Sequence, residues 1–109
     1  MANVLNFNTT KKQYMTVILP DEKNTTLMVC MPTKALFEEL TSIKDTLNAT
    51  DNDQIISDLY DLVARLASRN KGGIQVTKEY LESCLDFEDI ITFIRSYTVF
   101  IKSVKSSKN

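Results

Sequence analysis

The sequence predicts an α+β protein in which an N-terminal β-hairpin is followed by about four helices, so that helix predominates. Two β-favouring runs, 13–19 and 25–31, stand on either side of a polar turn, as they do in a hairpin. From residue 34 onward, apolar residues recur every three or four positions, which is the period of an amphipathic helix. Glycine and proline number 2 each, which favours regular elements joined by short connections.

Alternation within the two β-favouring runs gives each predicted strand one apolar face. In the first run that face consists of Met15, Val17 and Leu19. In the second run it consists of Leu27, Val29 and Met31. Residues 20–24 supply the turn. The polar residues 1–11 precede the hairpin as a short strand or a flexible arm, with an apolar burst at Val4, Leu5 and Phe7.

The first two helices are predicted from caps and apolar spacing. Thr33 can cap a helix that begins at Lys34 and ends at residues 48–50. Its apolar face consists of Leu36, Phe37, Leu40, Ile43 and Leu47. Thr50 or Asp51 can cap the next helix, and Asp51 with Gln54 resembles a capping box. The apolar residues of this helix are Ile55, Ile56, Leu59, Leu62, Val63 and Leu66, and we expect residues 71–73 to end it.

Two more helices follow. Thr77 can cap a short helix, whose apolar residues are Tyr80, Leu81, Cys84 and Leu85. Asp86 can cap the last and longest helix, and Glu88 and Asp89 suit its first turn. We expect one domain over residues 1–109, with residues 102–109 forming a frayed helix end and a disordered tail.

The last helix is apolar over most of its circumference, whereas a surface helix normally has one apolar stripe. Such a helix is either packed into the core of the fold or part of an interface with another chain. The interface interpretation predicts a protein-binding surface made of Ile90, Phe93, Tyr97, Phe100, Ile101 and Val104. Within this set, the members nearest the chain end are expected to stay exposed, namely Tyr97, Phe100, Ile101 and Val104.

The composition of the chain excludes several kinds of catalytic and metal-binding site. The chain has no histidine, which excludes histidine-dependent catalytic triads and most zinc sites. Residues 71–73 lack the pattern of a phosphate loop, and residues 51–53 start like a calcium loop that Ile55 and Ile56 then contradict. Cys30 and Cys84 are expected to be reduced, buried thiols. We therefore predict a protein that is not an enzyme and has no catalytic, metal or cofactor-binding site.

Charge and hydropathy bear on location and partners. The net charge is −1, and no basic face of the kind that binds nucleic acid is evident. No apolar run reaches the roughly 20 residues that cross a bilayer, and the first residues lack the features of a signal peptide, so we expect a cytoplasmic protein. Between residues 35 and 64, acidic residues far outnumber the single base Lys44. This excess is either a solvated face or an acidic surface for a basic partner, comprising Glu38, Glu39, Asp58 and Asp61.

The order of these segments resembles the tail assembly chaperones of long-tailed bacteriophages and of prophages in Gram-positive bacteria. The resemblance covers almost the whole chain: a polar arm, a hairpin, helices, and a last aromatic helix that begins Leu85-Asp86-Phe87-Glu88-Asp89-Ile90. It implies a non-enzymatic protein of the bacterial host cytoplasm that associates with itself. It also implies two partners, the tape-measure protein, which such chaperones keep soluble, and the tail tube subunits that polymerise around it.

Two other classes of function stay open at this stage. One is a minor virion component, either a tail-completion protein or a head–tail connector. The other is a small acidic regulator or antitoxin that binds a protein or DNA. A chaperone should form a soluble complex with a tape-measure fragment, whereas a DNA-binding regulator should shift DNA.

Overall fold

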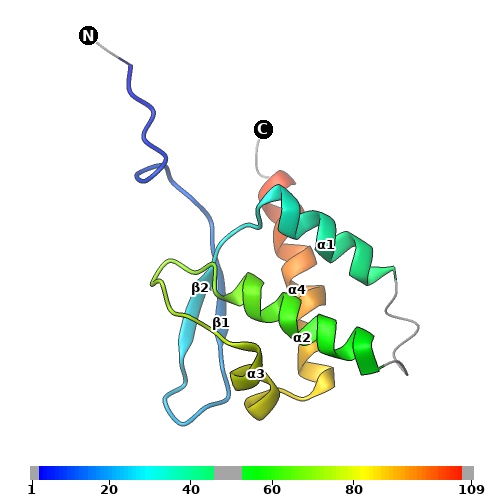
Figure 1. Ribbon diagram of the computed structural model, residues 1–109. Helices are drawn as coiled ribbons and strands as arrows, with labels where there is room; N and C mark the ends of the chain where they lie inside the picture. The colour runs from blue at the N-terminus through cyan, green and yellow to red at the C-terminus, as the bar shows by residue number, and fades with distance from the viewer. Residues whose placement is uncertain (1–2, 46–52, 107–109) are drawn as a thin grey trace.

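The computed structural model describes residues 3–45 and 53–106. Its elements are β1 (Met15–Ile18), β2 (Thr26–Val29), α1 (Lys34–Lys44), α2 (Asp53–Ala67), α3 (Lys78–Cys84) and α4 (Phe87–Ser106). Figure 1 shows the hairpin beside the helices, with the N-terminal arm leaving the body. The predicted α+β fold, with a hairpin before predominantly helical structure, is confirmed.

The hairpin is antiparallel, and Val17 stands opposite Leu27. The predicted alternation is confirmed, because Leu27 and Val29 are buried while Thr26 and Met28 are exposed. Asp21 organises the turn: its carboxylate accepts hydrogen bonds from the backbone N–H of Thr25 at 2.8 Å and from its hydroxyl at 2.6 Å.

Three predicted helix starts are confirmed by side-chain caps. The Thr33 hydroxyl accepts from the N–H of Leu36 at the start of α1, and the Thr77 hydroxyl accepts from the N–H of Tyr80 at the start of α3. Before α4, Asp86 and Asp89 each accept a hydrogen bond from the other's N–H, at 2.8 and 3.0 Å. This reciprocal pair satisfies N–H groups that a helix start leaves unpaired.

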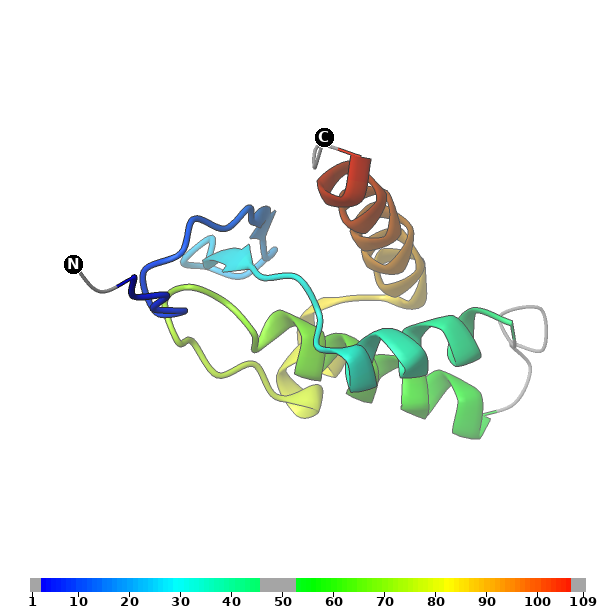
Figure 2. The same cartoon turned by 90° about the horizontal axis from the view of Figure 1, so that it is seen from above.

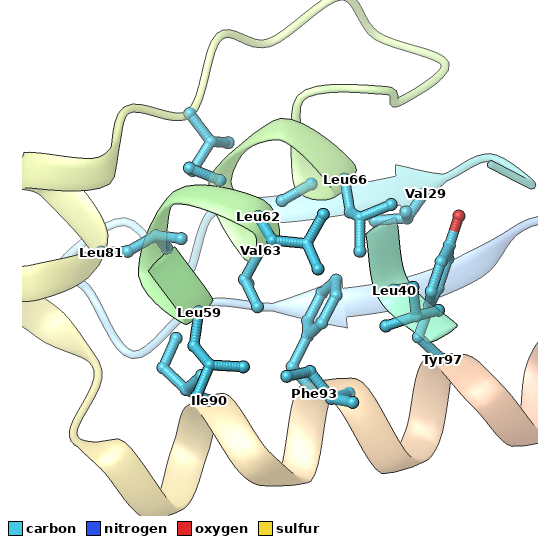
Figure 3. Close-up of a cluster of buried hydrophobic side chains, with 14 of the residues drawn as sticks. Val29, Leu40, Leu59, Leu62, Val63, Leu66, Leu81, Ile90, Phe93 and Tyr97 are labelled. Carbon is cyan, nitrogen blue, oxygen red and sulfur yellow. The ribbon is translucent and has the colours of Figure 1, made fainter. Parts of the chain in front are cut away.

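Helix α2 holds the central position in the core, since it packs against α1, α3, α4 and β2. Figure 3 shows its side chains meeting those of the other helices and of β2. Three large α2 residues are essentially inaccessible: Leu59, Leu62 and Leu66. The alternative that packs the last helix into the core fits this arrangement, since six residues of α4 are buried, although α2 and not α4 is the central helix.

Two predicted boundaries also need correction. Helix α2 ends at Ala67, before the predicted residues 71–73, because the backbone turns there into a loop that joins the hairpin. Helix α4 continues to Ser106, so residues 102–106 are helical and the predicted disordered tail is wrong for them. The predicted caps Thr50 and Asp51, the apolar position Leu47 and residues 107–109 lie outside the described residues.

Candidate protein-binding groove

The interface interpretation of the last helix predicted a surface made of its apolar residues, and most of these residues are buried in the fold. Ile90 and Tyr97 are 0% exposed, Phe93 8%, Ile101 4% and Val104 7%, while Phe100 is half-buried against the core. The expectation that Tyr97, Phe100, Ile101 and Val104 stay exposed is therefore wrong. The hairpin, α1 and α2 together cover the wide apolar face that one element could not cover.

Tyr97 shows why this face belongs to the core. Its hydroxyl donates a 2.6 Å hydrogen bond to the backbone carbonyl of Cys30, so α4 is tied to the end of β2. Burial raises the pKa of the Tyr97 hydroxyl well above its usual range. Its ring lies 5.7 Å from that of Phe93 and 5.9 Å from that of Phe100. A charge at this position would be expected to unfold the protein rather than to weaken an interface.

The predicted acidic surface is largely paired within the chain. Arg65 contacts Glu39 at 2.5 Å and Asp61 at 3.0 Å, and Lys34 lies 3.5 Å from Glu38. The Asp58 carboxylate accepts a hydrogen bond from the side chain of Gln54. Lys34 and Arg65 stand just outside the interval 35–64 in which the charges were unbalanced. These pairs neutralise much of the field that a basic partner would recognise.

The outer edge of β2 is covered by the loop that follows α2. The N–H of Cys30 donates to the carbonyl of Arg69 at 2.7 Å, and the N–H of Lys71 donates to the carbonyl of Met28 at 2.9 Å. The side chain of Arg69 adds a 3.2 Å bond to the carbonyl of Met31. Together with the Tyr97 hydroxyl, these bonds satisfy the outward backbone groups at the end of β2.

Asn70 holds this covering loop in place. Its side-chain amide donates to the carbonyls of Ala67 and Ile74, at 2.9 and 2.7 Å, and its side-chain oxygen accepts from the N–H of Ile74 at 2.8 Å. Asn70 is 9% exposed, so water has little access to replace these bonds. Gly73 has a φ of +68°, a conformation that glycine adopts without steric cost.

The outer edge of β1 is open. The N–H of Leu19 bonds the carbonyl of Thr25, so the alternation of an antiparallel ladder turns the backbone groups of Met15 and Val17 toward β2. The N–H and C=O groups of Thr16 and Ile18 then point away from β2. Among the described residues no backbone hydrogen bond reaches them from outside the hairpin. An edge of this kind is a template for an added strand.

A groove of about 410 Å³ runs along this open edge. One wall is formed by residues 15–20, which comprise β1 and the two residues after it. The other wall is formed by Asp89, Thr92, Phe93 and Ser96 of α4. The apolar lining of the groove is completed by Val63 and Ala67 of α2, by Leu81 of α3, and by Leu85, which directly follows α3. Figure 2 shows β1 and α4 facing each other across this region. We call this feature the β1–α4 groove. Of the residues predicted to bind protein, only Phe93 lines it.

The β1–α4 groove is acidic at its end near the hairpin turn. Asp89 is the charged residue in the groove lining. The hydrogen bond from Thr25, followed by that from the Tyr80 hydroxyl, lowers the pKa of the Asp21 carboxylate to about 2. Burial, and then the carboxylates of Asp21 and Asp89, raise the pKa of the Cys84 thiol. The Cys84 thiol therefore lies near the carboxylates of Asp21 and Asp89.

Neither cysteine is as buried as expected. Cys30 and Cys84 are both half-buried and form no disulfide. A raised pKa reduces the thiolate fraction of Cys84, and the thiolate is the reactive form. No group of three or more potential metal ligands occurs within residues 3–45 and 53–106.

The groove was missed at the sequence level, although part of its signal is in the sequence. The run 15–18 (Met-Thr-Val-Ile) contains none of the lysines or prolines that proteins place on edge strands to block pairing. The run 26–29 (Thr-Leu-Met-Val) lacks them too, so the sequence could have marked both hairpin edges as unblocked but not which of them is open. The wall opposite β1 could not have been found from the sequence, because its residues come from three helices that are distant from β1 along the chain.

None of the described helices is long and apolar enough to cross a membrane. Comparison with protein-family models, with curated proteins and with solved structures finds no match to this chain.

Proposed function

We propose that this protein is a non-enzymatic tail assembly chaperone, which binds the tape-measure protein in the host cytoplasm and keeps it soluble until tail tube subunits surround it. The proposal rests on the resemblance described above and on one structural observation. That observation is the β1–α4 groove, an apolar channel beside an open strand edge. The groove replaces the inner face of α4 as the proposed contact surface.

The groove has the two properties that binding an apolar segment requires. Its half-buried lining residues Met15, Val17 and Leu85 offer apolar surface, whose burial is worth about 25 cal/mol per Å². The outward backbone groups of Thr16 and Ile18 can hydrogen-bond any extended chain, whatever its side chains. A chaperone for a long apolar protein needs this tolerance, because it must bind many segments of different sequence.

The proposal is tested by co-expressing the full chain with a fragment of a phage tape-measure protein and measuring how much fragment stays in the supernatant. A matched pair of α4 variants locates the site. Thr92 and Ser103 are both exposed polar residues of α4, and only Thr92 lines the groove. We expect Thr92→Arg to lose the solubilising effect and Ser103→Arg to retain it.

Two outcomes would overturn the proposal. One is a fragment that precipitates equally with and without the wild-type chain. The other is equal solubilisation by Thr92→Arg and Ser103→Arg, which would separate the activity from the groove. A band shift with DNA in the same preparations would favour the regulator class instead.

A further inference from the structure

The N-terminal arm presents apolar side chains that no described part of its own chain covers. Val4 is 83% exposed, Leu5 69% and Phe7 71%. The hydrogen bonds around this stretch are local: the N–H of Thr9 donates to the carbonyl of Asn6, and the N–H of Asn8 donates to the side chain of Asn6. Figures 1 and 2 show the arm leaving the body instead of lying between β1 and α4.

We propose that the arm of a second copy of this chain adds as a strand to the open edge of β1 and places Leu5 and Phe7 in the β1–α4 groove. The inference rests on the proposed function only in using the same groove. It assigns that groove a resident occupant, which a client must displace.

The side-chain pattern of the arm matches the groove. In a strand, Leu5 and Phe7 share one face, and Val4 and Asn6 share the other. A strand paired with β1 would direct Leu5 and Phe7 to the side of Val17 and Leu19, which line the groove. Val4 and Asn6 would then lie on the outer side, where Ile18 is 64% exposed.

The lengths are also compatible. Residues 4–7 span about 10 Å when extended, and the β1 wall at 15–20 spans about 17 Å, so the apolar part of the arm fits within the groove. Residues 3–12 together reach roughly 33 Å. The short dimensions of the molecule are 33 and 19 Å. The arm can therefore cross from one copy to the groove of a neighbour.

Charge favours a second copy over an unrelated apolar peptide. The arm continues into Lys11 and Lys12, which are exposed and lie in a basic region with Arg69. The groove has Asp89 in its wall, and Asp86 and Glu88 are exposed beside it at the start of α4. An arm that pairs parallel to β1 carries its lysines toward the turn end of the hairpin, where these carboxylates lie, and such pairing steers association.

An arm that enters a neighbour's groove leaves its own groove free for a third copy. Contacts of this heterologous type extend into rings or open chains unless two copies exchange arms reciprocally. We therefore expect self-association that increases with concentration and that a bound client reduces.

The first experiment measures self-association of the full chain by sedimentation velocity over a range of concentrations. We expect Leu5→Asp/Phe7→Asp to weaken association by roughly tenfold or more, because two apolar side chains lose their buried site. The matched control is Asn8→Asp/Thr10→Asp, which adds the same charge to polar positions of the same arm. It should associate more strongly than Leu5→Asp/Phe7→Asp, because it keeps both apolar side chains.

The second experiment identifies the occupant by mixing two proteins in a Cys30→Ala/Cys84→Ala background. One carries Phe7→Cys and the other carries Ser96→Cys in the groove wall. Under mild oxidation we expect a disulfide between the two proteins. A partner carrying Asp58→Cys, which is exposed on α2, should give little of this product.

A wild-type chain that is monomeric at every concentration would overturn the inference. The inference would also fail if Phe7→Cys and Ser96→Cys formed a disulfide only when one chain carries both substitutions, because the arm would then fill its own groove. The chaperone proposal fails separately. If Leu5→Asp/Phe7→Asp abolishes association and the tape-measure fragment still precipitates with every variant, the arm inference stands and the proposed client is wrong.

Discussion

The two edges of the hairpin have the same backbone chemistry and opposite surroundings. At the β2 edge, the N–H of Cys30 bonds the carbonyl of Arg69, and the carbonyl of Cys30 accepts from the Tyr97 hydroxyl. At the β1 edge, Thr16 and Ile18 face an apolar groove without such partners among the described residues. One edge has been built into the core, and the other has been left available.

This difference separates a structural edge from a binding edge. Open edges promote aggregation, and proteins usually block them with lysine, proline or a covering segment. Here a covering segment, held by Asn70, protects β2 only. We infer that β1 stays open because an added strand pairs there. The following experiments test this difference between the two edges.

The largest effect is expected from a pair of proline substitutions, one at each edge. Cys30→Pro removes the N–H that bonds Arg69 at 2.7 Å and should cost about 3 kcal/mol of unfolding free energy. Thr16→Pro removes an N–H that points outward and should cost less than about 1 kcal/mol. Urea unfolding measures both.

The same two proline variants separate an effect on stability from an effect on self-association. Thr16→Pro should stay folded by circular dichroism and lose self-association, because the added strand can no longer bond that position. Equal destabilisation by the two prolines would show that both edges are structural, and the comparison would fail.

A smaller effect is expected from removing the side chain that holds the covering loop. Asn70→Ala leaves the carbonyls of Ala67 and Ile74 without their donor, which should cost about 2 kcal/mol. Amide hydrogen exchange should quicken at Cys30 and Lys71, while the N–H of Leu19 inside the hairpin stays protected. Asn8→Ala, at an exposed asparagine of the arm, serves as the control and should change stability by less than about 0.5 kcal/mol. Unchanged exchange at Cys30 would mean that Asn70 does not hold the loop.

The smallest effect concerns the hairpin turn, where the open edge ends. The pKa of Asp21 is lowered from 3.8 to about 2, first by its hydrogen bond from Thr25 and then by that from Tyr80. A carboxylate whose pKa is lower in the folded state stabilises the fold above its unfolded pKa, and it loses that contribution as pH falls. The difference in urea midpoint between wild type and Asp21→Asn should therefore be present at pH 5 and shrink between pH 4 and pH 2. Glu22→Gln, at the exposed neighbouring residue, is the control. A difference that does not change with pH would contradict the role of the Asp21 hydrogen bonds.

Local signals predicted the elements well because their causes are local. The hydroxyls of Thr33 and Thr77 bond N–H groups a few residues away, and the alternation in β2 is a property of any strand with one buried face. The site was predicted poorly for the opposite reason. An apolar residue such as Tyr97 has the same sequence pattern whether it packs against its own chain or against another.

The hairpin, the helix caps and the order of the elements follow from the sequence, because short-range hydrogen bonds and periodicity decide these features. The central position of α2, the covering of α4, and the contrast between one closed strand edge and one that borders a groove emerge only when the chain has folded. These outcomes depend on contacts between distant segments, such as Tyr97 with Cys30. A residue's neighbours in space, and not its neighbours in sequence, decide whether an apolar face is core or binding surface.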